Sequence, residues 1–202
     1  MNKIISSEDL SNKIQSLKNK KKKIVLCHGV FDIIHAGHIS HFKSAKKFGD
    51  ILIVSVTSDK YVNKGFNRPM FELNKRKKIL SELNIIDYVC DSDSQDAISI
   101  IEKIKPNFYC KGPDYKKFDN DITNKIKKEI KILKKFGGKF KVTEDQTFSS
   151  SKIINLLNKG NTLNDKFLLK INKKFSKNYV SEAVKSFNDL KVLVIGESIL
   201  DE

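Results

Sequence analysis

The sequence contains no tryptophan, only three prolines and only three cysteines among 202 residues. Cys27, Cys90 and Cys110 are too few and too scattered for a disulfide scaffold or a paired-cysteine metal site. We therefore expect buried free thiols and a reducing, cytoplasmic compartment. The sequence also lacks an apolar run of the ~18 residues that a membrane-spanning helix needs, and its first residues have no secretory signal pattern. No membrane partner is expected.

Arginine is scarce although the chain is strongly basic. There are 39 lysines and arginines against 24 acidic residues, a formal net charge of +15, yet only Arg68 and Arg76 are arginines. Proteins that bind nucleic acid usually use the bidentate arginine fork to hold phosphates and bases. A bias toward lysine, asparagine and isoleucine is what an A/T-rich coding sequence produces, so no nucleic-acid partner is expected. A diffuse positive field still attracts small anionic substrates.

Short apolar runs alternate with stretches of helical periodicity. Strands are expected at 24–27, 51–56, 88–90, 108–110 and 140–142, and helices around 7–19, 36–48, 72–83, 97–104, 122–133 and 150–158. Strands separated by helices form a parallel sheet, and right-handed crossovers place helices on both of its faces. The sequence therefore predicts an α/β fold with a doubly wound, five-stranded parallel sheet and a helical C-terminal extension. Ligands of such sheets bind beyond the carboxyl ends of the strands, at the switch point.

The pattern divides the chain into four parts. An N-terminal helix and basic linker occupy 1–23, the sheet domain occupies 24–158, and a helical linker occupies 159–190. The apolar run at 191–196 has the composition of a new strand. We therefore expect 191–202 to open a second domain that is truncated in this chain.

All four histidines fall within 14 residues of the first strand–loop–helix unit. His35 and His38 are three positions apart at an expected helix start, so both rings can face one ligand. The unpaired N–H groups of that helix end, with Gly37 allowing close approach, form a phosphate site with two titratable donors. A zinc site from His35, His38 and His41 is disfavoured, because no cysteine and only one carboxylate lie nearby. For His28 and His41 a structural role is expected.

The stretch Gly29-Val30-Phe31-Asp32, followed by His35-Ala36-Gly37-His38, resembles the HxGH signature of the nucleotidyltransferase (cytidylyltransferase-like) superfamily. Class I aminoacyl-tRNA synthetases share HxGH, but they need a far longer chain and a KMSKS-type loop that this sequence lacks. Further motifs follow at the expected strand ends: Ser58-Asp59, Lys64-Gly65, Arg68-Pro69, Arg76, 111–115 and 149–154. The resemblance implies a Rossmann-like nucleotidyltransferase fold.

Within the superfamily, residues 24–158 are similar to the adenylyltransferase domain of ADP-heptose synthases, which converts a heptose 1-phosphate and ATP to ADP-heptose and pyrophosphate. Residues 191–202 resemble the opening strand of a ribokinase-type (PfkB) sugar kinase, which implies a covalently linked kinase domain missing from this chain. The family often places its kinase first, and it usually has glycine where this chain has Pro113. Glycerol-3-phosphate cytidylyltransferases are the nearest competitor, but they carry an arginine before the serine cluster where this chain has Thr143-Glu144-Asp145-Gln146.

The resemblance implies a role for each motif. The expected catalytic residues, which donate hydrogen bonds to the α- and β-phosphates, are His35 and His38. The residues expected to bind the nucleotide are Val30, Phe31, Asp32, Gly37, Gly112, Asp114, Ser149, Ser150 and Ser151. Those expected to bind the sugar phosphate and pyrophosphate are Lys64, Arg68, Arg76 and Lys111. Mg²⁺ is the expected cofactor, held by the phosphates of ATP or CTP with few protein ligands. Plainer roles stay open: helix capping for the serines, a turn at 112–114, and surface ion pairs for the arginines.

The sequence therefore predicts a nucleotidyltransferase that transfers a nucleoside monophosphate, with AMP favoured, to a sugar phosphate such as heptose 1-phosphate and releases pyrophosphate. Three alternatives remain open. They are a CTP-dependent cytidylyltransferase acting on glycerol or polyol phosphate, a non-catalytic module that binds nucleotide or nucleic acid, and a structural partner of a kinase domain. A homo-oligomer, in the form of a dimer, is also expected.

Overall fold

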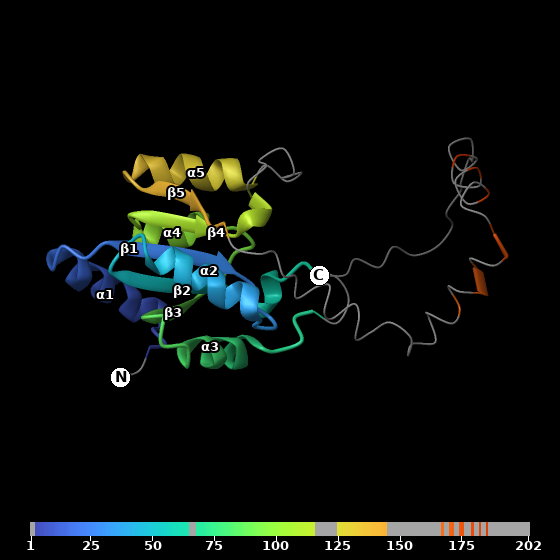
Figure 1. Ribbon diagram of the computed structural model, residues 1–202, viewed down its shortest axis with the longest axis horizontal. Coiled ribbons are helices and arrows are strands. Elements are labelled where there is room, and N and C mark those ends of the chain that lie inside the picture. Colours follow the sequence, from blue (N-terminus) through green and yellow to red (C-terminus); the bar gives the residue numbers. More distant parts are fainter. Residues whose placement is uncertain are drawn as a thin grey trace, which may run out of the picture. The chain divides into compact units, whose positions relative to one another are not determined.

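The computed structural model describes residues 3–64, 68–115 and 125–144, together with residues 167, 170, 171, 174, 175, 179, 182 and 185. The chain separates into two compact units, Met1–Lys152 and Ile153–Glu202. The first unit contains the sheet (Figure 1). In the second unit, the rings of Phe175 and Tyr179 stack with their centroids 5.0 Å apart. The helix expected at 150–158 and the strand expected at 191–196 lie outside the described residues.

Five parallel strands form one sheet in the order β3-β2-β1-β4-β5. They are β1 (Ile24–Gly29), β2 (Ile51–Thr57), β3 (Tyr88–Ser92), β4 (Phe108–Lys111) and β5 (Lys139–Val142). Nearly every residue of β1 and β2 is buried, because helices cover both faces of the sheet. The expected doubly wound α/β fold is confirmed. The strand order reverses at β1, which has β2 on one side and β4 on the other, so the switch point lies between β1 and β4.

Two layers of helices enclose the sheet (Figure 1). One layer, here called the α4 face, consists of α1 (Ser7–Asn19), α4 (Ile98–Ile104) and α5 (Lys125–Lys135). The other, the α2 face, consists of α2 (Ala36–Lys46) and α3 (Leu73–Ser81). The three cysteines are buried and free, as expected. Among the described residues, no helix is both long enough and apolar enough to cross a membrane.

The N-terminal segment packs with the sheet domain, although the sequence pattern separated 1–23 from it. Before α1, the Ile5 N–H donates to the Val89 carbonyl, and the Val89 N–H donates to the Lys3 carbonyl, both at 2.9 Å. The segment therefore runs along the outer edge of β3. The helix then buries an apolar stripe in the core of the α4 face, formed by Leu10, Ile14 and Leu17.

Glu129 of α5 is a carboxylate in the core of the α4 face, with only 4% of its surface exposed. Its oxygens accept hydrogen bonds from the backbone N–H of Ala97 at 2.8 Å and from the Tyr109 hydroxyl at 2.9 Å. Burial and the adjacent carboxylate raise the pKa of Tyr109 well above its ordinary value, so this hydroxyl remains a donor. Glu129 therefore ties α5 to the start of α4 and to β4.

Substitution of Glu129 tests this tie. Glu129→Leu is expected to lower the free energy of unfolding by about 2–6 kcal/mol, because two buried donors lose their acceptor. Glu129→Gln keeps an acceptor oxygen and is expected to cost less than half as much. Urea denaturation followed by circular dichroism measures both values. An unchanged midpoint for Glu129→Leu would show that the two donors find other partners.

Candidate active site

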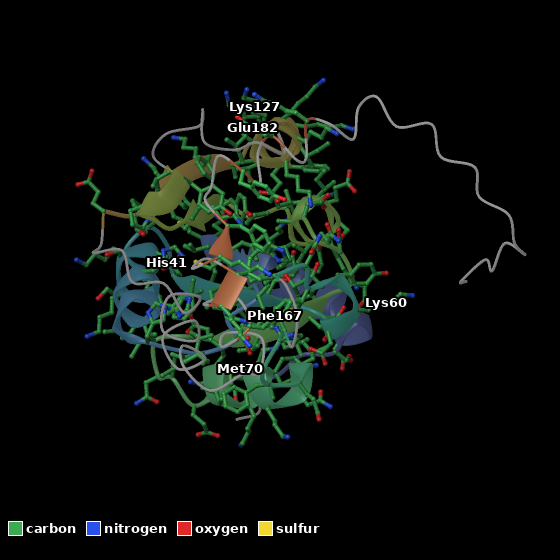
Figure 2. The ribbon with its side chains drawn as sticks, turned by 90° about the vertical axis from the view of Figure 1, so that its right-hand side faces the viewer. His41, Lys60, Met70, Lys127, Phe167 and Glu182 are labelled. Atoms are coloured by element: carbon green, nitrogen blue, oxygen red, sulfur yellow. The ribbon has the colours of Figure 1, made fainter. Side chains whose placement is uncertain are left out.

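A cavity of about 340 Å³ lies at the carboxyl ends of β1 and β4, at the switch point of the sheet. This volume falls in the range of small-molecule pockets. Its described lining consists of His28, Gly29, Val30, Phe31, His35, Gly37, His38, His41, Thr57, Lys64, Gln95, Lys111, Gly112, Pro113 and Tyr115. Figure 2 shows the first unit from the side on which these strand ends lie, with His41 labelled. The cavity is therefore where the strand order predicts a ligand site.

His35 and His38, here called the histidine pair, lie side by side on this cavity. His35 is the N-cap of α2, and its carbonyl accepts a hydrogen bond from the His38 N–H at 2.9 Å. This turn of helix stacks the two rings, with centroids 3.9 Å apart and an interplanar angle of 25°. The first turn of α2 carries no acidic side chain, and Gly37 lines the cavity there. The positive end of the helix is thus available to an anion.

Both imidazoles of the histidine pair are neutral at pH 7. Burial, and then repulsion by His35, His41 and Lys64, lowers the pKa of His38 to about 3, although a hydrogen bond with the Ile33 backbone opposes this shift. Burial also lowers the pKa of His35. The Nδ1 atom of His38 is buried and has no hydrogen-bond partner within the part of the chain that the structure describes. A ligand hydroxyl could donate to it, or it could donate to a phosphate oxygen after taking up a proton.

Buried neutral histidines make stability depend on pH. Burial and the nearby Lys111 lower the pKa of His28 to about 3, as for His38. Unfolded histidines take up protons near pH 6.5, so the unfolded state binds more protons than the folded state below that pH. Stability therefore falls as the pH falls from about 6.5 toward 3. Between pH 6.5 and 5 we expect a loss of about 1.6 kcal/mol for each of these two histidines.

Urea unfolding at pH 6.5 and pH 5 measures this loss directly. His28→Asn should remove about half of it, because asparagine does not titrate. Equal stability of the unsubstituted protein at both pH values would show that the rings become protonated in the folded state.

The connection from β1 to α2 contains a left-handed residue, Phe31, with φ of 48°. Its ring packs edge-on against His38, with centroids 5.4 Å apart, and against Phe42 at 5.3 Å. A Cβ atom on Gly29 would lie 3.1 Å from this ring, so the glycine makes room for it. Val30 and Phe31 line the cavity, where the sequence placed them.

The Asp32 carboxylate holds a neighbouring segment of chain. It accepts hydrogen bonds from the backbone N–H groups of Met70 at 2.9 Å and Phe71 at 3.0 Å, and it pairs with Arg68 at 3.1 Å. Burial raises the pKa of Asp32, but these hydrogen bonds and the guanidinium outweigh burial and lower it below its ordinary value. Within the described chain, neither Asp32 nor Arg68 lines the cavity. In this structure the two side chains bind each other, and their expected contacts with nucleotide and sugar phosphate stay predictions.

Arg76 of α3 is completely buried, although the sequence singled it out for the sugar phosphate or pyrophosphate. Its guanidinium donates to the carbonyls of Val30, Thr57 and Phe71 and to the Asp59 carboxylate. Because all of these acceptors belong to the protein, Arg76 offers no surface to a substrate. It instead joins the ends of β1 and β2 to the segment before α3.

Two lysines supply positive charge to the cavity. Partial burial lowers the pKa of Lys64, with repulsion from Arg68 and Lys111 adding to this effect and Asp32 opposing it. Lys111, at the end of β4, donates to the His28 carbonyl at 3.2 Å and lies over the Tyr115 ring at 5.0 Å. Both lysines line the cavity, as does Gly112, beside which a Cβ atom would meet nothing within 4 Å.

Other expected contacts lie beyond the described lining. Asp114 falls in the 3₁₀ turn Pro113–Tyr115 at the cavity wall. Ser149, Ser150 and Ser151 lie outside the described residues. Within the described part of the chain, no cavity-lining residue is a carboxylate and no group of three candidate ligands could hold a metal ion. The described lining of the cavity therefore contains no carboxylate oxygen of the kind that Mg²⁺ prefers.

The sequence assigned structural roles to His28 and His41, and the structure shows hydrogen bonds for both. His28 contacts the hydroxyls of Ser55 and Thr57, and His41 contacts the Thr143 hydroxyl at 2.8 Å. However, both rings also line the cavity. Sequence reasoning gave no site role to four other lining residues, namely Thr57, Gln95, Pro113 and Tyr115, although the last two belong to the motif at 111–115. Their places at the end of β2 and just beyond the ends of β3 and β4 are the signal that would have found them.

Residues 26–156, which span the sheet and the cavity, match the family described as Cytidylyltransferase-like. The chain belongs to the cytidylyltransferase-like family. The resemblance to HxGH nucleotidyltransferases is thereby confirmed, and the cavity at the switch point is the candidate active site of a nucleotidyltransferase.

Curated relatives of this cytidylyltransferase-like chain are longer proteins. The Bifunctional protein HldE of Blochmanniella pennsylvanica (strain BPEN) is 37% identical over 161 residues, which are 78% of this chain and 32% of that protein. The Bifunctional protein HldE of Campylobacter concisus (strain 13826) is 39% identical over 139 residues, 68% of this chain and 29% of that protein. The chain thus spans about a third of the length of these relatives.

Among solved structures, the lipopolysaccharide core biosynthesis protein from Thermoplasma volcanium GSS1 is 29% identical to this chain in sequence. It aligns with a TM-score of 0.49 and covers 63% of this chain and 99% of its own.

Proposed function

We propose that this domain transfers a nucleoside monophosphate, with AMP preferred, from a nucleoside triphosphate to a sugar phosphate of the heptose 1-phosphate class. The observation that carries the proposal is the stacked histidine pair at the N-terminus of α2. It lies in a cavity whose described lining contains lysines but no carboxylates, which is complementary to a polyphosphate. The motif resemblance to ADP-heptose synthases supports AMP and a heptose phosphate.

In the proposed reaction, an oxygen of the acceptor phosphate attacks the α-phosphorus in line. The bond from the α-phosphorus to the bridging oxygen breaks, and pyrophosphate leaves with the electron pair. The attacking phosphate is already ionised, so no general base is needed. His35 and His38 donate hydrogen bonds to the α- and β-phosphate oxygens, where negative charge increases in the transition state. Mg²⁺ would be held chiefly by the phosphate oxygens, with few protein ligands.

Pyrophosphate release tests the proposal. The protein is incubated with Mg²⁺, one of ATP, CTP, GTP and UTP, and either heptose 1-phosphate or glycerol 3-phosphate. We expect release with ATP and heptose 1-phosphate, and mass spectrometry should detect ADP-heptose. Turnover of CTP with glycerol 3-phosphate would instead make the chain a glycerol- or polyol-phosphate cytidylyltransferase. No turnover, with nucleic-acid binding that is insensitive to His35→Ala, would make it a binding module.

We also propose that a sugar-kinase domain is covalently linked to this one in the full protein. Two observations support it: the relatives are named bifunctional and are about three times as long as the matched segment, and residues 191–202 resemble a kinase strand. An immunoblot of the native protein is expected to show a mass well above 23.1 kDa. A native mass equal to that of this chain would contradict the proposal.

A further inference from the structure

The cavity has two halves that come from opposite faces of the sheet. Successive residues of a strand point to alternate faces. Leu26 of β1 and Ile53 of β2 pack in the α4 face, so His28 and Thr57, two and four positions later, lie toward that same face. The histidine pair instead belongs to α2, on the opposite face. The part of the cavity on the side of the α4 face, here called the α4-face half, thus contains His28, which has no role in the proposed reaction.

His28 lies at the floor of this α4-face half. Only 6% of its surface is exposed, and its two ring nitrogens lie 3.3 Å from the Ser55 hydroxyl and 3.5 Å from the Thr57 hydroxyl. These distances are at the long limit of hydrogen bonds. Burial keeps the ring neutral, since its pKa is lowered to about 3. A neutral imidazole beside a hydroxyl can donate one hydrogen bond and accept another, which suits an alcohol rather than a phosphate.

The same half has a polar rim. Gln95, in the connection between β3 and α4, is exposed at the mouth of the cavity. Its side-chain oxygen accepts a hydrogen bond from the Lys125 ammonium at 2.9 Å. Because lysine can only donate, this contact fixes which end of the amide is oxygen and leaves the NH₂ group for an acceptor atom. Lys111 adds a positive charge next to His28, whose carbonyl it binds.

We infer that the α4-face half of the cavity is the acceptor subsite, in which His28 and Thr57 bind a hydroxyl of the sugar phosphate. The inference rests on the proposed function and deepens it. In-line transfer requires the attacking and leaving oxygens to lie on opposite sides of the α-phosphorus. With the triphosphate bound at the histidine pair and Lys64, the α4-face half is the polar part of the described lining that is left for the attacking group. Lys111 supplies charge for the acceptor's phosphate, and Gln95 donates to an outer hydroxyl.

Two variants with a matched control test the inference. His28→Leu keeps the bulk but removes both polar atoms, and it should raise the KM for heptose 1-phosphate about tenfold while changing the KM for ATP less than twofold. His28→Asn keeps a donor and an acceptor and should lie between His28→Leu and the unsubstituted protein. The control is Ser92→Ala, which removes a buried polar group that also lies at the carboxyl end of a strand but outside the described lining. It should change neither KM.

Equilibrium binding separates this inference from the proposed reaction. Isothermal titration calorimetry measures heptose 1-phosphate binding to the protein saturated with a non-reactive ATP analogue. Weaker sugar-phosphate binding by His28→Leu, with unchanged binding of the analogue, supports the subsite even if no pyrophosphate is released. Loss of analogue binding instead would place the nucleotide in this half and overturn the inference. Unchanged binding of both ligands would also overturn it.

Discussion

His38→Ala is expected to lower the turnover of nucleotidyl transfer about 10²–10³-fold, the usual effect of removing one donor that stabilises charge in a transition state. In the structure, His38 stacks on His35 and packs against the Phe31 ring, and its buried Nδ1 atom has no hydrogen-bond partner among the described residues. This atom is therefore the donor that the substitution removes. Single-turnover measurements at saturating nucleotide isolate the chemical step. Activity within threefold of the unsubstituted protein would remove the histidine pair from the mechanism.

Nucleotide binding is also expected to take up a proton at His38. The ring already makes a hydrogen bond with the Ile33 backbone, and donating to a phosphate through Nδ1 as well requires both nitrogens to be protonated. The negative phosphates favour this imidazolium form. Calorimetry of ATP-analogue binding at pH 7 in buffers of different ionisation enthalpy should show an uptake approaching one proton. His38→Asn should abolish it, and buffer-independent heats for the unsubstituted protein would contradict the expectation.

Arg76→Met is expected to lower the free energy of unfolding by about 3–5 kcal/mol, as happens when one partner of a buried charged network is removed. It would leave the carbonyls of Val30 and Thr57 and the Asp59 carboxylate without their donor. Arg76→Lys should recover only part of the loss, because a single ammonium cannot reach acceptors spread around a planar fork. Chemical denaturation measures both variants.

The same variants separate a structural role for Arg76 from substrate binding. If Arg76 positions the connection from β1 to α2, Arg76→Lys should weaken binding of nucleotide and sugar phosphate together. An undiminished unfolding energy with a raised KM for the sugar phosphate alone would restore the role that the sequence indicated.

The order of helices and strands could be predicted from the sequence, because each element has its own local pattern of apolar residues. The apolar runs around Val25 and Val54 predict buried parallel strands, and the spacing of His35 and His38 predicts that both rings share one face at a helix start. That the two rings stack is a finding of the structure. The partners of the arginines could not be predicted in this way. Arg76 donates to the carbonyl of Val30, 46 residues away, and backbone carbonyls carry no sequence signature. The two arginines stand out because arginine is rare in this chain, but rarity does not distinguish a buried structural residue from one that binds substrate.

The sequence also did not predict that the cavity has one half on each face of the sheet. His28 looked like an ordinary strand residue, and its relation to Thr57 depends on the register in which β1 pairs with β2. That register aligns His28 with Ser55 and brings Thr57 to the same side. Gln95 has no motif around it, and it lines the cavity from the connection between β3 and α4.

The pairing of Lys3 and Ile5 with Val89 has a consequence for solubility. An unpaired edge strand is a template for edge-to-edge association between molecules, and in this chain the N-terminal segment occupies the β3 edge. At the opposite edge, β5 carries the exposed lysines Lys139 and Lys141, whose like charges disfavour approach of a second copy. Residues 3–5 thus cover the β3 edge, and a preparation that lacks the first five residues is expected to associate through that edge.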